Sequence, residues 1–357
     1  MVEWLGEVCK PFMMVHPEAS IKKNKQKLMK YAYLLNTDFM KSIKVYSLLA
    51  LFLLMSCSQS NKENNGSGEM SGNISVSGAF ALYPLVVKWA EEFRKIHPDV
   101  RVDVQAGGAG KGIADALGGQ VELGMVSRDL HEEEIKKGAW FIPVTKDAVL
   151  PTFNASNPYA SDILKKGISK ETFIQLWIEG KPLTWGEIVG KTAKDQVKVY
   201  KRADAAGAAE SWAKYLGKKQ DDLKGVGVTG DPGLAQAVRG DVFGIGFNNV
   251  IYAYDINTKK LHQGVQIIPI DINSNGVIDP EENFYNSLDD INKAIADNKY
   301  PSPPARELYL VAKGKPTDPL VTAFLQWILT DGQKYVNEAG FVNLGKEKIT
   351  EAHNKLK

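Results

Sequence analysis

The chain has 357 residues, of which 44% are hydrophobic and 24% charged, and its formal net charge is +2. This length suits two lobes better than one small domain, and the apolar content is sufficient to build real cores. A charge so close to zero gives no indication of nucleic acid or of an acidic substrate as a partner.

A secretion signal is predicted near the N-terminus. Two lysines precede the apolar run 45–55, which is followed by Ser56 and Cys57. A basic segment, about ten apolar residues and a small residue at the cleavage point form a signal peptide that is too short to span a bilayer. Residues 40–56 are therefore expected to be the signal, and residues 1–39 a doubtful upstream extension. A buried helix is the alternative.

The end of the signal and the cysteine after it, Leu54-Met55-Ser56-Cys57, resemble the lipobox of bacterial lipoproteins. That resemblance implies cleavage before Cys57, acylation of this cysteine, and a periplasmic lipoprotein held at the membrane only by its lipid. The polar stretch 57–72 then reads as a flexible tether. The other cysteine, Cys9, lies in the upstream extension, so neither a disulfide nor a cysteine metal site is expected.

Alternating strands and helices follow the tether. Apolar alternation predicts strands at 73–78, 100–104 and 121–126, with helices that begin at Pro84 and at Ile113. Strands and helices that alternate at this spacing are typical of a parallel sheet with helices on its faces. Ligands of such sheets bind beyond the carboxyl ends of the strands.

Three candidate anion-binding loops follow these strands, at 78–82, 107–112 and 127–129. The second loop is glycine-dense and precedes a helix, whose free amides and positive dipole end suit an anion. Lys111 is followed by glycine instead of Ser or Thr, so this is not a nucleotide P-loop. Taken alone, the loop could be an ordinary chain reversal. Its convergence with the other two favours an anion site.

The second half repeats the pattern of strand, charged turn and helix. The strand 196–200 leads to Arg202, and a helix follows with Trp212, Tyr215 and Leu216 on its buried face. The other expected elements are a crossing strand at 148–153, helices at 169–178 and 185–189, strands at 242–247 and 265–270, a return crossing at 307–312 and a helix at 319–337.

Five motifs in this order resemble the periplasmic phosphate-binding protein of phosphate ABC transporters. They are Gly78-Ala-Phe-Ala-Leu-Tyr-Pro84, Gly107-Gly-Ala-Gly-Lys-Gly112, Val126-Ser-Arg128, Arg202-Ala-Asp-Ala-Ala-Gly-Ala208 and Ala305-Arg-Glu-Leu-Tyr-Leu-Val-Ala-Lys313. The resemblance covers roughly residues 73–345. It implies an α/β, two-lobed type 2 periplasmic-binding-protein fold with two crossover strands and a central cleft.

The resemblance also implies the domain boundaries and the function. Residues 73–150 with 307–357 would form lobe I, and residues 151–306 lobe II. A monomer would bind inorganic phosphate with high affinity between the lobes and deliver it to an ABC transporter permease, without chemistry on the ligand. The implied ligand-binding residues are Ala79, Phe80 and Ala81, then Ala109, Gly110 and Lys111, then Ser127 and Arg128, and from the other lobe Arg202, Asp204, Ala206, Gly207 and Ala208.

Departures from the family pattern leave the ligand open. Alanine or phenylalanine stands at several positions where the family usually has Ser or Thr, which would cost a few kcal/mol at roughly 0.5–1.5 kcal/mol per hydrogen bond. Sulfate, molybdate and tungstate are alternative ligands, and a sensing or adhesion lipoprotein is an alternative function. Asp204 could instead be a helix N-cap that orients Arg202. An enzyme is not expected, because the five histidines are scattered with no metal-spaced pair.

A second motif fits a calcium loop. The stretch 271–282 has oxygen side chains at template positions 1, 3, 5, 9 and 12, a glycine at position 6 and an apolar residue at position 8. A solvated Asn/Gly turn is the alternative. A structural Ca²⁺ is expected to stiffen lobe II, with no cofactor for catalysis. Its ligands would be Asp271, Asn273, Asn275, the main-chain carbonyl of Val277, Asp279 and Glu282.

Overall fold

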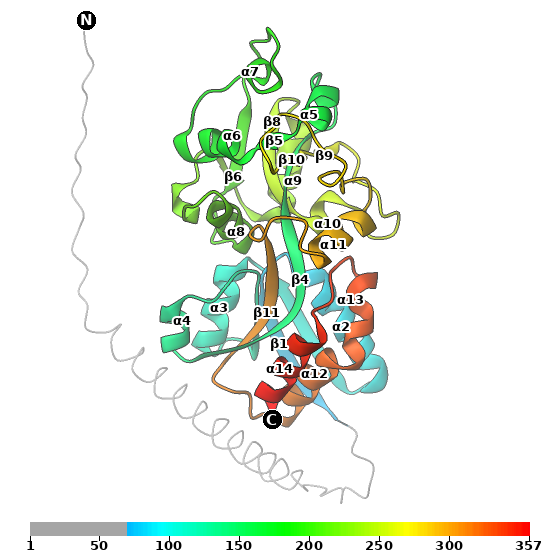
Figure 1. The fold of residues 1–357 in the computed structure, drawn as a ribbon. Coiled ribbons are helices and arrows are strands. Elements are labelled where there is room, and N and C mark those ends of the chain that lie inside the picture. Colours follow the sequence, from blue (N-terminus) through cyan, green and yellow to red (C-terminus); the bar gives the residue numbers. More distant parts are fainter. Residues whose placement is uncertain (1–69) are drawn as a thin grey trace, which may run out of the picture. The chain divides into compact units, whose positions relative to one another are not determined.

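The computed structural model describes residues 70–357, which Figure 1 shows as a ribbon. The predicted signal peptide, Cys57 and most of the tether lie outside the described residues. Within 70–357, none of the helices is both long and apolar enough to cross a bilayer.

Three parallel strands form the centre of the first lobe. Strand β1 (Gly72–Gly78) lies between β2 (Val100–Ala106) and β3 (Leu123–Val126). Helices α2 (Tyr83–Ile96) and α3 (Ala109–Gly118) connect them. The alternation predicted from the sequence is confirmed, with one correction. Helix α3 begins at Ala109, four residues before the predicted Ile113, so the glycine-dense turn itself forms the first helical turn.

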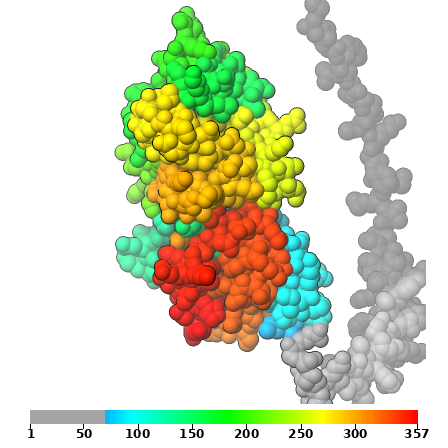
Figure 2. All heavy atoms as spheres, turned by 45° about the vertical axis from the view of Figure 1, so that its right-hand side comes forward, coloured from blue at the N-terminus to red at the C-terminus, as the bar shows by residue number. Residues whose placement is uncertain are grey.

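The C-terminal helices return to the first lobe. Helix α12 (Pro319–Leu329) packs against α2 and β1, and the orange-to-red segment lies beside the blue-to-cyan one in Figure 2. The predicted helix 319–337 is interrupted after Leu329, and its last residues belong to the separate helix α13 (Tyr335–Glu338). The chain turns at Thr330 into a 3₁₀ turn, where the carbonyl of Gly332 accepts the indole N–H of Trp89 at 2.8 Å. The other helices of this lobe are α4 (Glu132–Lys136), α13 (Tyr335–Glu338) and α14 (Lys346–Leu356).

The second lobe combines short strands with more helices. Its strands are β5 (Ile168–Ser169), β6 (Lys198–Arg202), β7 (Val226–Val228), β8 (Gly244–Asn249), β9 (Val265–Ile267) and β10 (Ile270–Asp271). Its helices are α5 (Ala160–Lys166), α6 (Lys170–Ile174), α7 (Trp185–Val189), α8 (Gly207–Tyr215), α9 (Gly230–Gly240), α10 (Val250–Ala253) and α11 (Leu288–Ala296).

Two predictions in this lobe need correction. The predicted helix 169–178 changes from α6 into a π-helical stretch, Gln175–Glu179. The predicted strand 265–270 is split into β9 and β10, since Pro269 between them has no amide to donate to a ladder. Helices α9 and α11 were not predicted from the sequence.

Two long antiparallel strands join the lobes, β4 (Ala139–Asn154) and β11 (Ala305–Lys313). The first part of β4 pairs with β11, and its last part pairs with β8 of the second lobe. The result is one nine-stranded sheet in the order β2-β1-β3-β11-β4-β8-β6-β7, with β9 paired to β4. Both predicted crossings, 148–153 and 307–312, lie within these strands.

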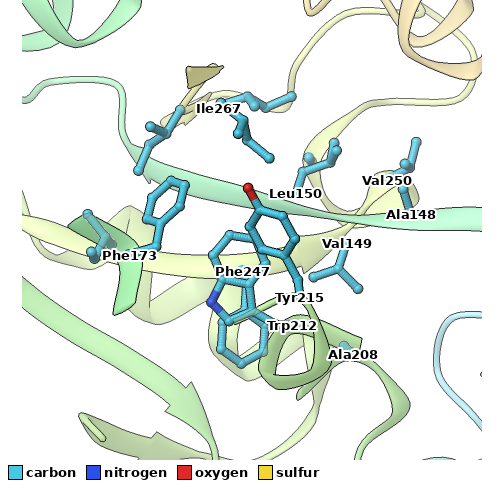
Figure 3. Close-up of a cluster of buried hydrophobic side chains, with 14 of the residues drawn as sticks. Ala148, Val149, Leu150, Phe173, Ala208, Trp212, Tyr215, Phe247, Val250 and Ile267 are labelled. Carbon is cyan, nitrogen blue, oxygen red and sulfur yellow. The ribbon is translucent and has the colours of Figure 1, made fainter. Parts of the chain in front are cut away.

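Each lobe has its own hydrophobic core. In the second lobe, Trp212 of α8 stacks on Phe247 of β8 with 5.9 Å between ring centroids and meets Phe173 edge-on at 5.2 Å (Figure 3). Such aromatic pairs add about 0.5–1.5 kcal/mol each beyond their buried area. Trp212, Tyr215 and Leu216 are all buried, as the helical spacing predicts. This core fixes α8, whose first turn faces the other lobe.

Candidate anion-binding site

The three predicted loops follow β1, β2 and β3 and lie together at one edge of the first lobe. The amides of Gly107 and Gly108 donate to the carbonyl of Gly78 at 2.8 and 3.0 Å, which binds the second loop to the first. Gly78 has φ 133°, and a Cβ there would overlap the carbonyl of Met125. Glycine is therefore required where the loops approach one another.

The loops meet the segment 202–208 of the second lobe directly. The amide of Gly110 donates to the carbonyl of Ala205 at 3.2 Å. A Cβ on Gly207 would overlap both oxygens of Ser127. The ring of Phe80 lies over the Arg202 guanidinium, with 5.6 Å between ring centroid and Cζ. All three first-lobe loops thus reach the second-lobe segment, as the sequence predicts, and the lobes are closed on one another.

Main-chain amides are the most abundant donors here. Within residues 70–357, no protein group accepts a hydrogen bond from the amides of Phe80, Ala81, Ala109, Gly207 or Ala208. The last three belong to the first turns of α3 and α8, where amides have no partner within the helix and the helix dipole favours an anion.

Three of the predicted ligand residues have main-chain amides that are occupied in this conformation. The Gly110 amide donates across the cleft to Ala205, and the Ala206 amide donates to Oε1 of Gln220 at 3.1 Å. These positions are corrected from ligand donors to groups that stabilise the closed loops. Ala79 donates its amide to the carbonyl of Met125 at 2.9 Å and likewise holds the loop in place.

Arg202 is the buried cation of the site, only 2% exposed. Its Nε donates to Oδ1 of Asp204 at 2.8 Å, and its Nη2 pairs with the other oxygen of that carboxylate. Nη1 forms an ion pair with Oδ2 of Asp231 at 2.6 Å. A guanidinium has five N–H groups, so donors remain for a ligand after these three contacts. Burial lowers the pKa of Arg202, and the two carboxylates outweigh this effect, so the pKa is raised. The arginine stays charged, with donor capacity to spare.

Asp204 orients Arg202, as one of its two predicted roles requires, but it is not the N-cap of α8. Its Oδ1 accepts the amide of Gly230 at the start of α9. The alternative as an N-cap therefore fails, because Ala206 is the N-cap of α8 and Thr229 that of α9. Burial would raise the pKa of Asp204, but Arg202 and the Gly230 amide outweigh burial and lower it.

Arg128 points to carboxylates, which corrects its predicted place among the ligand donors. Its Nη1 and Nη2 bond Glu134 at 2.8 and 2.6 Å, and its Nε lies 3.0 Å from Glu210 of α8, across the cleft. Nε2 of His131 also lies at hydrogen-bond distance from Oε1 of Glu210, at 2.8 Å. Beside this group, Lys214 pairs with Asp129 at 2.6 Å. We call Arg128, Glu134, His131 and Glu210 the interlobe latch.

Lys111 is also corrected as a ligand donor. Its ammonium pairs with Asp115, one turn further along α3, and about half of its side chain is exposed. Asp115 accepts Oγ of Ser77 at 2.6 Å as well. The lysine thus forms an i,i+4 ion pair within α3.

Asp231, Asn249 and Glu210 were not predicted from the sequence. Asp231 begins the unpredicted helix α9, Asn249 lies two residues beyond the predicted strand 242–247, and Glu210 was masked by the apolar pattern of α8. The one available signal was Gly230-Asp231-Pro232, a helix-start pattern.

A cavity of about 390 Å³ lies next to the latch and the crossover strands, with Arg128, Glu210, Ser211, Arg306 and Tyr309 among its lining residues. None of the loops that carry free amides lines it. The free amides and this cavity are therefore separate features of the region where the lobes meet.

The predicted calcium loop is well ordered. Asp271 accepts the amides of Asn275 and Gly276 at 3.1 and 2.9 Å, and Glu282 accepts the amides of Ile272 and Asn273 at 2.9 and 3.2 Å. Asp279 accepts the side-chain amide of Asn273, and Val277 is exposed. In the described part of the chain, no three His, Cys, Asp or Glu side chains gather as a metal site would. Calcium binding stays a prediction.

Comparison with known proteins agrees with this architecture. Residues 63–332 match the family model for the PBP superfamily domain. The chain is 25% identical over 313 residues to the phosphate-binding protein PstS of Staphylococcus saprophyticus, covering 86% of this chain and 91% of the relative. It is 31% identical over 190 residues to PstS of Bacillus subtilis, covering 50% of this chain and 60% of that protein.

Among solved structures, a substrate-binding protein of the phosphate ABC transporter class from Clostridium perfringens, with bound phosphate, has a TM-score of 0.62 and 21% identity. The match covers 77% of this chain and all of that structure. This likeness bears on the fold: two α/β lobes on shared strands. Since the family model covers most of the chain, including both lobes and both crossing strands, the protein belongs to the PBP superfamily.

Proposed function

We propose that this protein binds inorganic phosphate between its lobes and delivers it to an ABC transporter permease. The observation that carries the proposal is that three helix-start loops with free amides, two from the first lobe and one from the second, lie together where the lobes meet, beside the charged Arg202. A buried arginine with unused N–H groups and amides at helix N-termini suits a tetrahedral oxyanion.

The relatives support phosphate as the ligand. Proteins called phosphate-binding protein PstS match along most of this chain, from Staphylococcus saprophyticus and from Pseudomonas aeruginosa. These relatives are transport proteins, and we infer the same role here, with no chemistry on the ligand. The permease partner follows from that role.

Few hydroxyls reach the site, so its affinity has to come from other donors. Ser127 supplies a hydroxyl next to Gly207, and the remaining donors are amides and Arg202. Hydrogen bonds with a charged partner contribute about 1.5–3 kcal/mol, roughly twice a neutral one. Bonds from Arg202 and from amides to an anion thus offset the missing hydroxyls.

We further propose that Cys57 carries lipid and holds a monomeric protein at the membrane on the periplasmic side. This extension rests on the signal and lipobox pattern, which lies outside the described residues. Incorporation of labelled palmitate into the parent protein, and its loss in Cys57→Ala, would be the expected result. Equal labelling of both proteins would refute the anchor.

Calorimetric titration of the purified protein tests the ligand. Phosphate, sulfate, molybdate and tungstate are compared at pH 6 and pH 8, and phosphate should bind most tightly. Arg202→Ala should abolish high-affinity binding while the circular dichroism spectrum stays unchanged. Preference for another oxyanion would replace phosphate by that ligand, and failure to bind any of them would favour a sensing or adhesion role.

A further inference from the structure

A chain of five buried polar side chains leads from the anion site to both crossover strands. It runs from Arg202 on β6 through Asp231, Asn249 and Arg306 to Asp147 on β4, and each of these residues is at most 9% exposed. Asn249 donates to Asp231 at 2.7 Å, and Arg306 of β11 donates to Asn249. Arg306 also lies 3.2 Å from Asp147.

Two carboxylates contact the Arg202 guanidinium, and each is fixed by a different part of the structure. Asp204 lies two residues after Arg202, in the same loop that touches the first lobe. Asp231 belongs to a different element, α9, and its Oδ1 accepts a hydrogen bond from Asn249. Asp231 can therefore fix the guanidinium even when the loop moves.

The crossover strands hold the far end of this chain. Arg306 donates to Asn249, to Oγ of Ser211 at 3.0 Å and to Asp147. Asp147 lies where β4 leaves the first lobe, and Arg306 where β11 enters it. Contacts that reach the strands shared by both lobes thus hold Arg202 in place, in addition to contacts within the second lobe.

Asp231 affects anion binding in two ways of opposite sign. Its negative charge, 2.6 Å from Nη1 of Arg202, opposes the attraction of an anion. Its contact also fixes a long side chain that would otherwise lose rotamer entropy on binding the ligand. An experiment that removes only the charge separates the two effects.

We propose that Asp231 is the positioning residue of the anion site: tied by Asn249 and Arg306 to the crossover strands, it fixes the Arg202 guanidinium for the ligand. This inference rests on the proposed function, since it takes the ligand of Arg202 to be an oxyanion. Asp231 acts through Arg202 and does not itself contact the ligand.

The test uses phosphate and the near-isosteric variant Asp231→Asn, which keeps an acceptor for Asn249. Positioning predicts that phosphate binds about tenfold more weakly or worse, as expected when a bond to a charged group is lost. Tighter or unchanged binding would mean that the charge effect dominates, and would overturn the proposal. Asp241→Asn is the matched control, because this carboxylate bonds Tyr200 in the same lobe and is not part of the chain. Its affinity should stay within twofold of the parent.

Asn249→Ala removes the hydrogen bond that holds Asp231 and leaves every charge in place. If Asp231→Asn does not fold, this variant alone tests the effect on phosphate affinity. Asn249→Ala should also weaken phosphate binding. The double variant Asp231→Asn/Asn249→Ala should bind phosphate no more weakly than the weaker of the two single variants, because both substitutions act on the same series of buried side chains. If the losses of affinity add up in the double variant, or if Asn249→Ala binds phosphate like the parent, Asn249 does not act through Asp231.

A spectroscopic measurement separates this inference from the proposed function. The side-chain Nε–Hε signal of Arg202 is assigned in ¹⁵N-arginine-labelled protein by its absence in Arg202→Lys. In the parent without ligand this proton, which Nε donates to Oδ1 of Asp204, should exchange slowly. In Asp231→Asn or Asn249→Ala the contact that holds the guanidinium at Nη1 is weakened, so the bond to Asp204 should open more often and the proton should exchange at least about tenfold faster. Equal exchange in all three proteins would refute positioning, whichever anion binds. Failure of the parent to bind phosphate would refute the proposed function alone.

Discussion

Gly207 and Ser127 face one another across the cleft with no room for a methyl group between them. A Cβ at Gly207 would overlap the carbonyl and the hydroxyl oxygen of Ser127. Gly207 is the first residue of α8, and Ser127 follows β3, so this contact forms only when the lobes are closed. The absence of a side chain at Gly207 is therefore a condition for closure and not for the local fold.

Gly207→Ala should leave each lobe folded and weaken phosphate binding by about 5- to 100-fold, because overpacking costs roughly 1–3 kcal/mol and here opposes closure. Calorimetry measures the affinity, and small-angle scattering with phosphate shows whether the protein stays expanded. Gly240→Ala is the matched control, since a Cβ there meets nothing within 4 Å. If Gly207→Ala binds and compacts like the parent, closure does not bring these residues together.

The interlobe latch should set how long the ligand stays bound. In Glu210→Gln the link from Arg128 across the cleft is weakened, while Glu134 still neutralises the buried arginine. We expect the dissociation rate of phosphate to rise about tenfold, with little change in association, because the contact forms after the ligand has entered. Stopped-flow tryptophan fluorescence measures both rates.

Lys214→Ala is the control for the latch. The Lys214–Asp129 pair also crosses the cleft but is 60% and 65% exposed, and exposed pairs contribute about 0.2–1 kcal/mol at most. Its dissociation rate should change less than that of Glu210→Gln. Equal effects from the two variants would mean that burial of Arg128 does not matter.

Folding stability should depend on the protonation of Asp147. Burial raises the pKa of Asp147 to about 6, despite the lowering effect of Arg306. Because the pKa in the folded state is raised, this group stabilises the fold fully below about pH 4, and the stabilisation is lost as the pH rises through about 6. The loss is roughly 3 kcal/mol at most, at 1.36 kcal/mol per unit of pKa.

Asp147→Asn should therefore flatten the profile of unfolding free energy between pH 4 and 7, as measured by urea denaturation. Asp103→Asn, an exposed carboxylate on the edge strand β2, should leave the profile unchanged. If the unfolding free energy of Asp147→Asn changes as steeply with pH as that of the parent, the pH dependence comes from other groups.

Much of the site could be predicted because it is made from main chain. Amides at helix starts after parallel strands follow from the alternation of elements, and that pattern is local, so the loops at Phe80, Ala109 and Gly207 were placed correctly. Arg202 was found because it follows the predicted strand 196–200 and precedes a helix. The loops needed only local sequence, whereas the individual ligand residues were implied by the family resemblance.

The partners of the charged side chains could not be predicted. Glu134 and Glu210 hold Arg128, and Asp231 contacts Arg202, through pairs up to 82 residues apart in the sequence. The Glu210 contact depends on how the lobes close, and the other two on how the elements of one lobe pack. Sequence shows which side chains carry charge but not which charges meet. The boundaries of β9 and α12 failed for a related reason, since Pro269 and Gly332 act through tertiary hydrogen bonding.

The calcium prediction can be tested apart from phosphate binding. The loop 271–282 closes on itself through Asp271 and Glu282, each 4% exposed, and no Lys or Arg of the described residues lies within 4 Å of either carboxylate. Ca²⁺ would compensate these charges, so it should raise the melting temperature of the parent by several degrees at saturating concentration. EDTA should reverse the increase.

Glu282→Ala should remove this response, because the template takes its bidentate ligand from position 12. Glu281→Ala is the matched control, since this neighbouring carboxylate is exposed and lies outside the template positions. Differential scanning calorimetry with Ca²⁺, Mg²⁺ and EDTA measures the shifts, and Mg²⁺ should give a smaller one because it prefers octahedral sites that keep several waters. If the parent melts at the same temperature with Ca²⁺ and with EDTA, the loop is a hydrogen-bonded turn that needs no metal.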